Sequence, residues 1–177
     1  SAASDVYKRQ ITTRIPGRLW RNASCGARIV SLGPDTIQVL LPHGPGMRLL
    51  DQVIRYDANE LVATTKQHRD LKNPLRRSCG MLPISSGIEF AGQATALHGA
   101  LLEGREFGQP RQGFLVMARD VSWRVTRLDE VLTELLIQVL LISRNNQSAM
   151  YQFHVSSPAE NLLLSGRLAV YFEAMPQ

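Results

Sequence analysis

The sequence predicts an α+β fold in which an antiparallel sheet curls around one long central helix. Residues 83–102 form a segment with helical start signals, rich in glycine and alanine. Four strand-like apolar segments follow it in succession, and a short helix and a strand pair precede it. A helix built from small residues lets neighbouring backbone approach closely, so we expect the sheet to wrap around it.

The first half of the chain is predicted to hold a short helix and a hairpin. Residues 34–41 have helical character, with Asp35 as the expected N-cap. A tight loop rich in proline and glycine follows. Strands are then expected over residues 53–56 and 60–69, on either side of the turn at 57–59.

The second half is predicted to be a run of antiparallel strands over residues 114–125, 133–143, 149–156 and 162–172. The stretch 135–142 is apolar nearly throughout, which is typical of a central strand buried on both faces.

Length and composition predict one domain. The chain has 177 residues, of which 44% are hydrophobic, enough for a single well-formed core. Its apolar runs are shorter than a membrane span requires. Two cysteines are too few for a disulfide framework and lack the spacing of a zinc site, so we expect a reducing, cytoplasmic setting without metal or other cofactor.

The net charge of +5 comes entirely from residues 1–29, which hold six basic side chains and one acidic one. The remaining residues hold fourteen basic and fourteen acidic side chains and so carry no net charge. We expect residues 1–33 to form a tail, disordered or foreign to the natural protein, and residues 34–177 to form the domain. A neutral domain does not favour nucleic acid as a partner.

Glu89 is the first candidate for chemistry. It lies two turns into the long helix, and the positions four residues away on either side are Ser85 and Gln93, so no basic residue is placed to pair with it. A carboxylate without a partner on an apolar helix either does chemistry, faces solvent or binds backbone donors.

Two motifs resemble those of the hotdog-fold β-hydroxyacyl-ACP dehydratases. The first motif of this family reads Leu-Pro-His, then any three residues, then an apolar triplet, then Val/Leu-Asp-Arg-Val. Residues 41–53 match its register without a gap. The second motif reads Met-Pro-Gly, then any four residues, Glu, any three residues and Gln-Ala. Its spacing is matched by Leu82-Pro83-Ile84, Glu89 and Gln93-Ala94. The resemblance covers about residues 34–172 and is nearest to the ApeP-like dehydratases associated with aryl-polyene synthesis. It implies a hotdog fold and a glutamate that acts together with a histidine.

The histidine that the family places fourteen residues before the glutamate is missing, because Leu75 stands there. Our first candidate for its role is His68, at the end of a predicted strand, and the second is His43. We expect His98 and His154 to be packing or surface residues.

The resemblance also implies supporting residues and partners. Substrate-binding or supporting roles are expected for His43, Asn73, Pro83, Gly87 and Gln93. A basic segment is expected to dock an acidic acyl carrier protein through Lys66, Arg69, Lys72, Arg76 and Arg77. Hotdog subunits pair, so a homo- or hetero-oligomer is expected.

The expected function is dehydration of β-hydroxyacyl thioesters on an acyl carrier protein, in lipid or polyene biosynthesis. Two alternatives stay open: a hotdog acyl-thioesterase, and a non-catalytic subunit that pairs with an active dehydratase. The dehydratase needs a histidine near Glu89, the thioesterase needs room for a water, and the non-catalytic subunit predicts a filled or apolar pocket.

Overall fold

The computed structural model describes residues 28–41, 43–103, 113–159 and 161–172. Most of these residues form seven strands and two α-helices. The elements are β1 (Arg28–Leu32), α2 (Pro34–Leu40), β2 (Gln52–Tyr56), β3 (Glu60–Thr65), α3 (Gly87–Leu102), β4 (Gly113–Trp123), β5 (Leu135–Arg144), β6 (Ser148–Ser156) and β7 (Leu162–Phe172). Single 3₁₀ turns lie at Pro45–Met47, Gln67–Arg69 and Ile84–Ser86.

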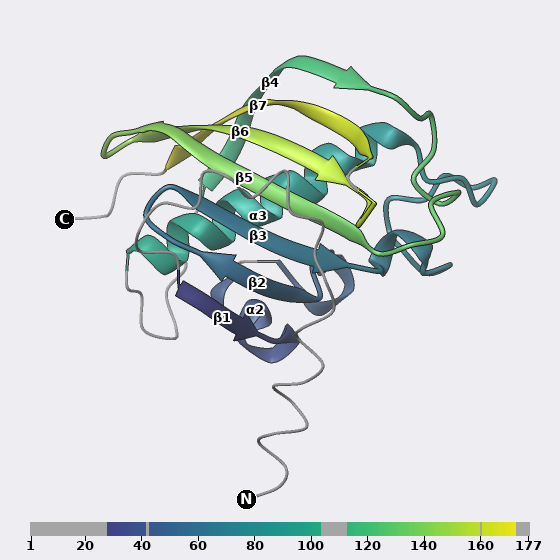
Figure 1. Ribbon diagram of the computed structural model, residues 1–177, viewed down its shortest axis with the longest axis horizontal. Helices are drawn as coiled ribbons and strands as arrows, with labels where there is room; N and C mark the ends of the chain where they lie inside the picture. Colours follow the sequence, from purple (N-terminus) through teal and green to yellow (C-terminus); the bar gives the residue numbers. More distant parts are fainter. Residues whose placement is uncertain (1–27, 42, 104–112, 160, 173–177) are drawn as a thin grey trace, which may run out of the picture.

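The strands form one antiparallel sheet in the order β1-β2-β3-β5-β6-β7-β4. The sheet curls around α3, which crosses behind it (Figure 1). This is the hotdog arrangement, and the predicted α+β class is confirmed.

The core lies between the concave face of the sheet and α3. Alternate residues of β5, β6 and β7 point inward, for example Ile137 and Val139 of β5, and meet Phe90 and Leu97 of the helix in one buried cluster. Gly87 fits this packing closely, because a Cβ there would lie 2.6 Å from Leu164 Cδ2 and the leucine side chain would have to shift.

Three expectations about elements are wrong. Residues 28–32 are not part of a tail but form β1, an edge strand that pairs with β2; residues 1–27 lie outside the described residues. Gly33, not Asp35, is the N-cap of α2, and Asp35 lies in the first turn, where its charge favours the helix dipole. Strand β5 is central but alternates between buried and half-buried residues, so only its inner face is fully covered.

Strand β4 is the other edge of the sheet, and its side chains are mostly exposed. Several are large and apolar: Phe114, Leu115, Val116, Met117 and Trp123. An apolar strand with an unpaired edge is a template for another chain.

Candidate active site

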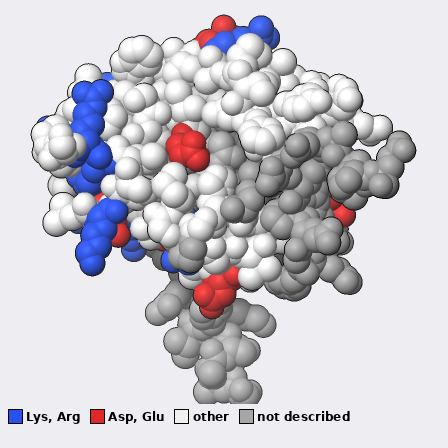
Figure 2. Space-filling view, turned by 180° about the vertical axis from the view of Figure 1, so that it is seen from behind, with Lys and Arg blue, Asp and Glu red and all other residues white. Residues whose placement is uncertain are grey.

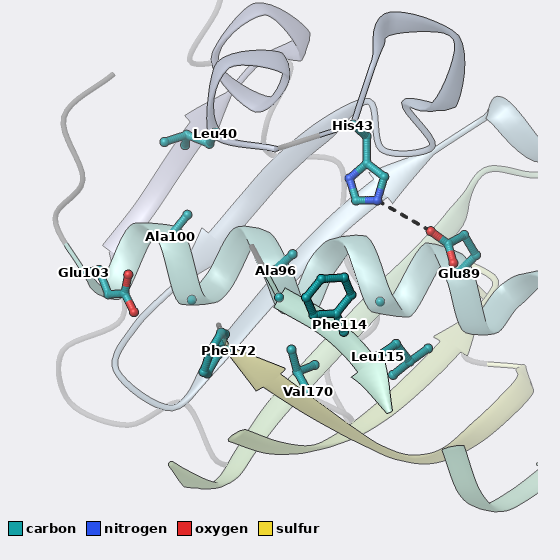
Figure 3. A pocket seen from close by; sticks show the side chains of 13 residues that line it. Leu40, His43, Glu89, Ala96, Ala100, Glu103, Phe114, Leu115, Val170 and Phe172 are labelled. Atoms are coloured by element: carbon teal, nitrogen blue, oxygen red, sulfur yellow. Dashed lines mark ion pairs between the residues drawn. The ribbon is translucent and has the colours of Figure 1, made fainter. Parts of the chain in front are cut away.

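Glu89 and His43 face each other across a short gap (Figure 3). The Oε1 atom of Glu89 lies 3.8 Å from Nε2 of His43, and the two side chains are 37% and 29% exposed. Glu89 comes from the first turn of α3, and His43 from the loop after α2. The distance exceeds that of a direct hydrogen bond, and both side chains line the same cavity, within reach of a molecule bound there.

The pair opens into a cavity of about 240 Å³. Leu40 and His43 lie on one side of α3, and Phe114, Leu115, Val170 and Phe172 lie on the other (Figure 3). The lining is otherwise apolar or without side chains, apart from Glu103 at the far end. Such a site combines acid–base groups with room for an apolar ligand.

Gln93 holds the loop that carries His43. It is fully buried, its Oε1 accepts a hydrogen bond from the Leu49 N–H at 2.9 Å, and its Nε2 donates to the Met47 carbonyl at 2.6 Å. At the other end of the loop, Gln38 Nε2 donates to the His43 carbonyl at 3.0 Å. Gln93 therefore positions His43 through the backbone of the loop, and its amide is bonded to that loop and not to Glu89, although both lie on α3.

The start of α3 is tied to the segment before β5. Asp129 Oδ1 accepts from the Leu82 N–H at 2.9 Å, and Ile84 donates to the Thr126 carbonyl at 3.0 Å. The Arg127 guanidinium, bonded to Asp129, lowers the pKa of that carboxyl to about 2. These contacts set where the first turn of α3, and hence Glu89, begins.

His68 is not brought to Glu89. It is fully buried, its Nε2 lies 2.9 Å from the Val131 carbonyl oxygen, and it does not line the cavity. Burial lowers its pKa, despite the opposing hydrogen bond to Val131. The predicted strand over residues 60–69 ends at Thr65, and the 3₁₀ turn at Gln67–Arg69 directs the ring inward. The structure thus pairs Glu89 with the second candidate, His43.

Three of the expected supporting residues brace the protein around the site. Asn73 is buried and holds its own loop, donating to the Gln67 carbonyl at 2.8 Å and accepting from the Leu75 N–H at 2.9 Å. Pro83 precedes the first turn and forms a bridge with Arg127. Gly87 is covered by Leu164, and neither it nor Asn73 or Pro83 lines the cavity.

The basic segment is folded on itself. Arg76 is largely buried and donates to the Asp70, Gly80 and His68 carbonyls, so it offers little charge to a partner. Lys66, Arg69, Lys72 and Arg77 are exposed. Figure 2 shows Lys and Arg side chains gathered along one margin of the molecule, beside a largely uncharged surface.

The remaining candidates lie elsewhere. His98 is buried between the Asp57 carbonyl (2.9 Å) and the Tyr151 hydroxyl (3.1 Å), and His154 lies beside Gln138 and Gln152. Within the described ranges, no three His, Cys, Asp or Glu side chains are grouped as metal ligands. No helix in the described part of the chain is long and apolar enough to cross a membrane.

The curled sheet, the long helix and the His43–Glu89 pair at its start are the arrangement of a hotdog protein. The family model described as ApeP-like, ApeP dehydratase, matches residues 35–177. The chain therefore belongs to the ApeP-like dehydratase family.

Solved structures agree with this assignment. The dehydratase heterocomplex ApeI:P from Xenorhabdus doucetiae is 26% identical, with a TM-score of 0.69, and the match covers 78% of this chain and 91% of that one. Two others show the fold alone. AziG of S. sahachiroi is 14% identical (TM-score 0.51; 70% and 91% covered), and the thioesterase HI1161 from Haemophilus influenzae is 11% identical (TM-score 0.52; 71% and 80% covered). None of the curated proteins compared with the chain matches it.

His43 is only the second candidate from the sequence, although the sequence carries a signal for it. The Leu-Pro-His motif matched the family in register, but the distance of 46 positions to Glu89 in the sequence hid their proximity. The bonds of Gln93 to residues 47 and 49 hold that loop against α3.

Proposed function

We propose that this chain dehydrates β-hydroxyacyl thioesters carried on an acyl carrier protein, with His43 and Glu89 as the acid–base pair. The observation that carries the proposal is the 3.8 Å approach of these two side chains at the mouth of an apolar cavity, in a member of a dehydratase family. An open cavity with a carboxylate also argues against a purely structural subunit, which would have a filled or apolar pocket.

In the proposed reaction, neutral His43 removes a proton from the α-carbon of the acyl chain. The electron pair of that C–H bond becomes the Cα=Cβ double bond, and the bond from Cβ to the hydroxyl oxygen breaks. Protonated Glu89 gives its proton to the leaving oxygen, which departs as water. The product is an α,β-unsaturated thioester, and proton transfer from His43 to Glu89 restores both groups.

The position of Glu89 suits this step. It lies in the first turn of α3, where the partial positive charge of the helix end stabilises negative charge as the thioester carbonyl is polarised. The Ile84 and Ser86 N–H groups are engaged with Thr126 and Pro83 carbonyls, so they do not supply that stabilisation.

Two partners are part of the proposal. The exposed side chains of four basic residues attract the acidic carrier protein: Lys66, Arg69, Lys72 and Arg77. The apolar edge of β4 pairs with a second hotdog subunit, as the heterocomplex from Xenorhabdus doucetiae suggests. Phe114 and Leu115 line the cavity from this edge, so a partner seated there would cover its open side.

The test is mass spectrometry of a β-hydroxyacyl carrier protein incubated with the wild-type chain and with Glu89→Gln, His43→Asn and His68→Asn. We expect wild type to remove one water, and Glu89→Gln and His43→Asn to lower the rate by roughly 10² to 10⁴. His68→Asn should keep most of its rate at temperatures where it is folded.

A matched control is Glu130→Gln, which neutralises an exposed carboxylate outside the cavity and should leave the rate unchanged. A free β-hydroxy acid as the product would indicate a thioesterase. No change of the substrate with this chain alone, together with turnover that Glu89→Gln does not alter when an active hotdog partner is present, would favour the non-catalytic subunit.

A further inference from the structure

The cavity continues from the His43–Glu89 pair along α3 to Glu103 (Figure 3). All the lining residues from this segment fall on one face of the helix: Glu89, Gly92, Ala96, Gly99, Ala100 and Glu103. At a rise of about 1.5 Å per residue, the distance along the axis is roughly 20 Å. The cavity is therefore long and narrow, with its acidic groups at the two ends.

Two of these residues are glycines that packing does not require. Glycine is unfavourable inside a helix, because it loses more conformational freedom on folding than alanine. A Cβ added at Gly92 or Gly99 would have no described atom within 4 Å, in contrast to the clash at Gly87. Gly99 is nevertheless buried, so the space in front of it belongs to the cavity.

We propose that Gly92 and Gly99 determine which acyl chains the site accepts, by leaving room for an extended, unbranched chain that runs from His43 and Glu89 toward Glu103. Leu115, Val170 and Phe172 form the apolar wall opposite these glycines and bury the methylene groups. Glu103 is paired with Arg144 at the far end, which keeps its carboxylate from facing the chain alone. The proposal rests on the proposed function, because it takes the His43–Glu89 pair as the reacting end.

Thermal stability gives the first test. Gly99→Ala should raise the melting temperature by about 2 °C, since alanine favours the helix and its methyl group enters open space. Gly87→Ala, the matched control in the same helix, should lower it because of the contact with Leu164. A lower melting temperature for Gly99→Ala would mean that packing requires this glycine and would overturn the proposal.

Ligand binding gives the second test. We would titrate the full chain with hexyl and hexadecyl thioethers of pantetheine, which can be neither dehydrated nor hydrolysed. Wild type should bind the hexadecyl compound more tightly. Gly99→Leu should weaken hexadecyl binding by roughly tenfold, the effect of about two methylene groups left unburied, and hexyl binding by clearly less. Gly92→Leu, one turn from Glu89, should weaken both.

Equal losses for both thioethers in Gly99→Leu, no loss for either, or no binding to wild type would overturn the proposal. Gly99→Ala is titrated with the same two thioethers and should show a smaller loss of hexadecyl binding. The comparison with wild type therefore remains possible if Gly99→Leu does not fold. Binding is measured without turnover. A chain that dehydrates nothing but shows this length dependence would refute the proposed function alone, and a dehydratase without it would refute this inference alone.

Discussion

At the scale of single residues, the site depends on a side chain that does no chemistry. Gln93 is fully buried and bonds to two backbone groups of the segment that follows His43. A backbone N–H or carbonyl that is buried without a partner is costly, so these bonds strongly favour one position of the loop. Glu89 lies one helical turn earlier, and the same helix face thus sets both members of the pair.

Gln93→Met should destabilise the protein by about 2–3 kcal/mol, because it keeps the volume of the side chain but leaves the Leu49 N–H and the Met47 carbonyl unpaired. Chemical denaturation measures this loss. Gln38→Met, which removes one part-buried bond to the His43 carbonyl, should cost about 1 kcal/mol or less. Equal stability of Gln93→Met and wild type would show that the loop is held by other contacts.

At the scale of elements, the start of α3 is held from outside the helix. Neither α3 nor the 3₁₀ turn before it has an N-cap side chain that hydrogen-bonds to its first turn. Asp129 instead accepts the Leu82 N–H and pairs with Arg127, joining the helix start to the segment before β5. The position of Glu89 therefore depends on residues about forty positions away.

Asp129→Asn should lower the melting temperature at neutral pH, because the ion pair with Arg127 is lost. The Arg127 side chain holds the pKa of Asp129 at about 2, below its ordinary value of 3.8. A carboxyl with a lowered folded pKa stabilises the fold above its ordinary pKa and loses that contribution as pH falls toward 2. Between pH 5 and about pH 2, the melting temperature should therefore fall more steeply with decreasing pH for wild type than for the variant. The same pH dependence of the melting temperature in both proteins would contradict the lowered pKa of Asp129.

At the scale of the whole molecule, stability should depend on pH through two buried histidines and one half-buried histidine. Burial lowers the pKa values of His68, His98 and His154 below the ordinary value of 6.5. The unfolded chain therefore takes up protons at a pH where the folded chain does not, and the free energy of unfolding falls as pH drops below about 6.5.

His98→Asn should reduce this pH dependence, because one of the three groups no longer titrates. The variant is also less stable at every pH, since the ring bridges the Asp57 carbonyl and the Tyr151 hydroxyl. Urea denaturation at several pH values between about 7 and 5 separates the two effects, because only the slope reports titration. An unchanged slope would mean that His98 is not among the groups responsible.

The edge of β4 sets how the molecule assembles under the proposed function. Val116 is 61% exposed on this edge strand, and Val116→Lys should prevent pairing with a second hotdog subunit, because it places a charge where apolar contact is expected. Light scattering of the chain with a co-expressed partner measures association. Ile142→Lys on β5, also exposed but away from the edge, is the control and should assemble normally.

The sequence by itself determined the fold class, the order of nearly all elements and the role of Glu89 as the candidate acid. These follow from local signals, namely alternation, turn residues and the spacing of the motif around residues 82–94. Strand β1 was not predicted, because it is short, lies on an edge and follows a charged segment. Its pairing with β2 therefore has no local signature in the sequence.

Only the tertiary structure decided which histidine meets Glu89. His68 is nearer in sequence, but a 3₁₀ turn and the Val131 carbonyl direct it into the interior. His43 is distant in sequence, yet Gln93 binds its loop to α3 through two backbone hydrogen bonds. Proximity between residues far apart in the chain depends on the packing of many elements, so the Leu-Pro-His motif by itself could not place His43 beside Glu89.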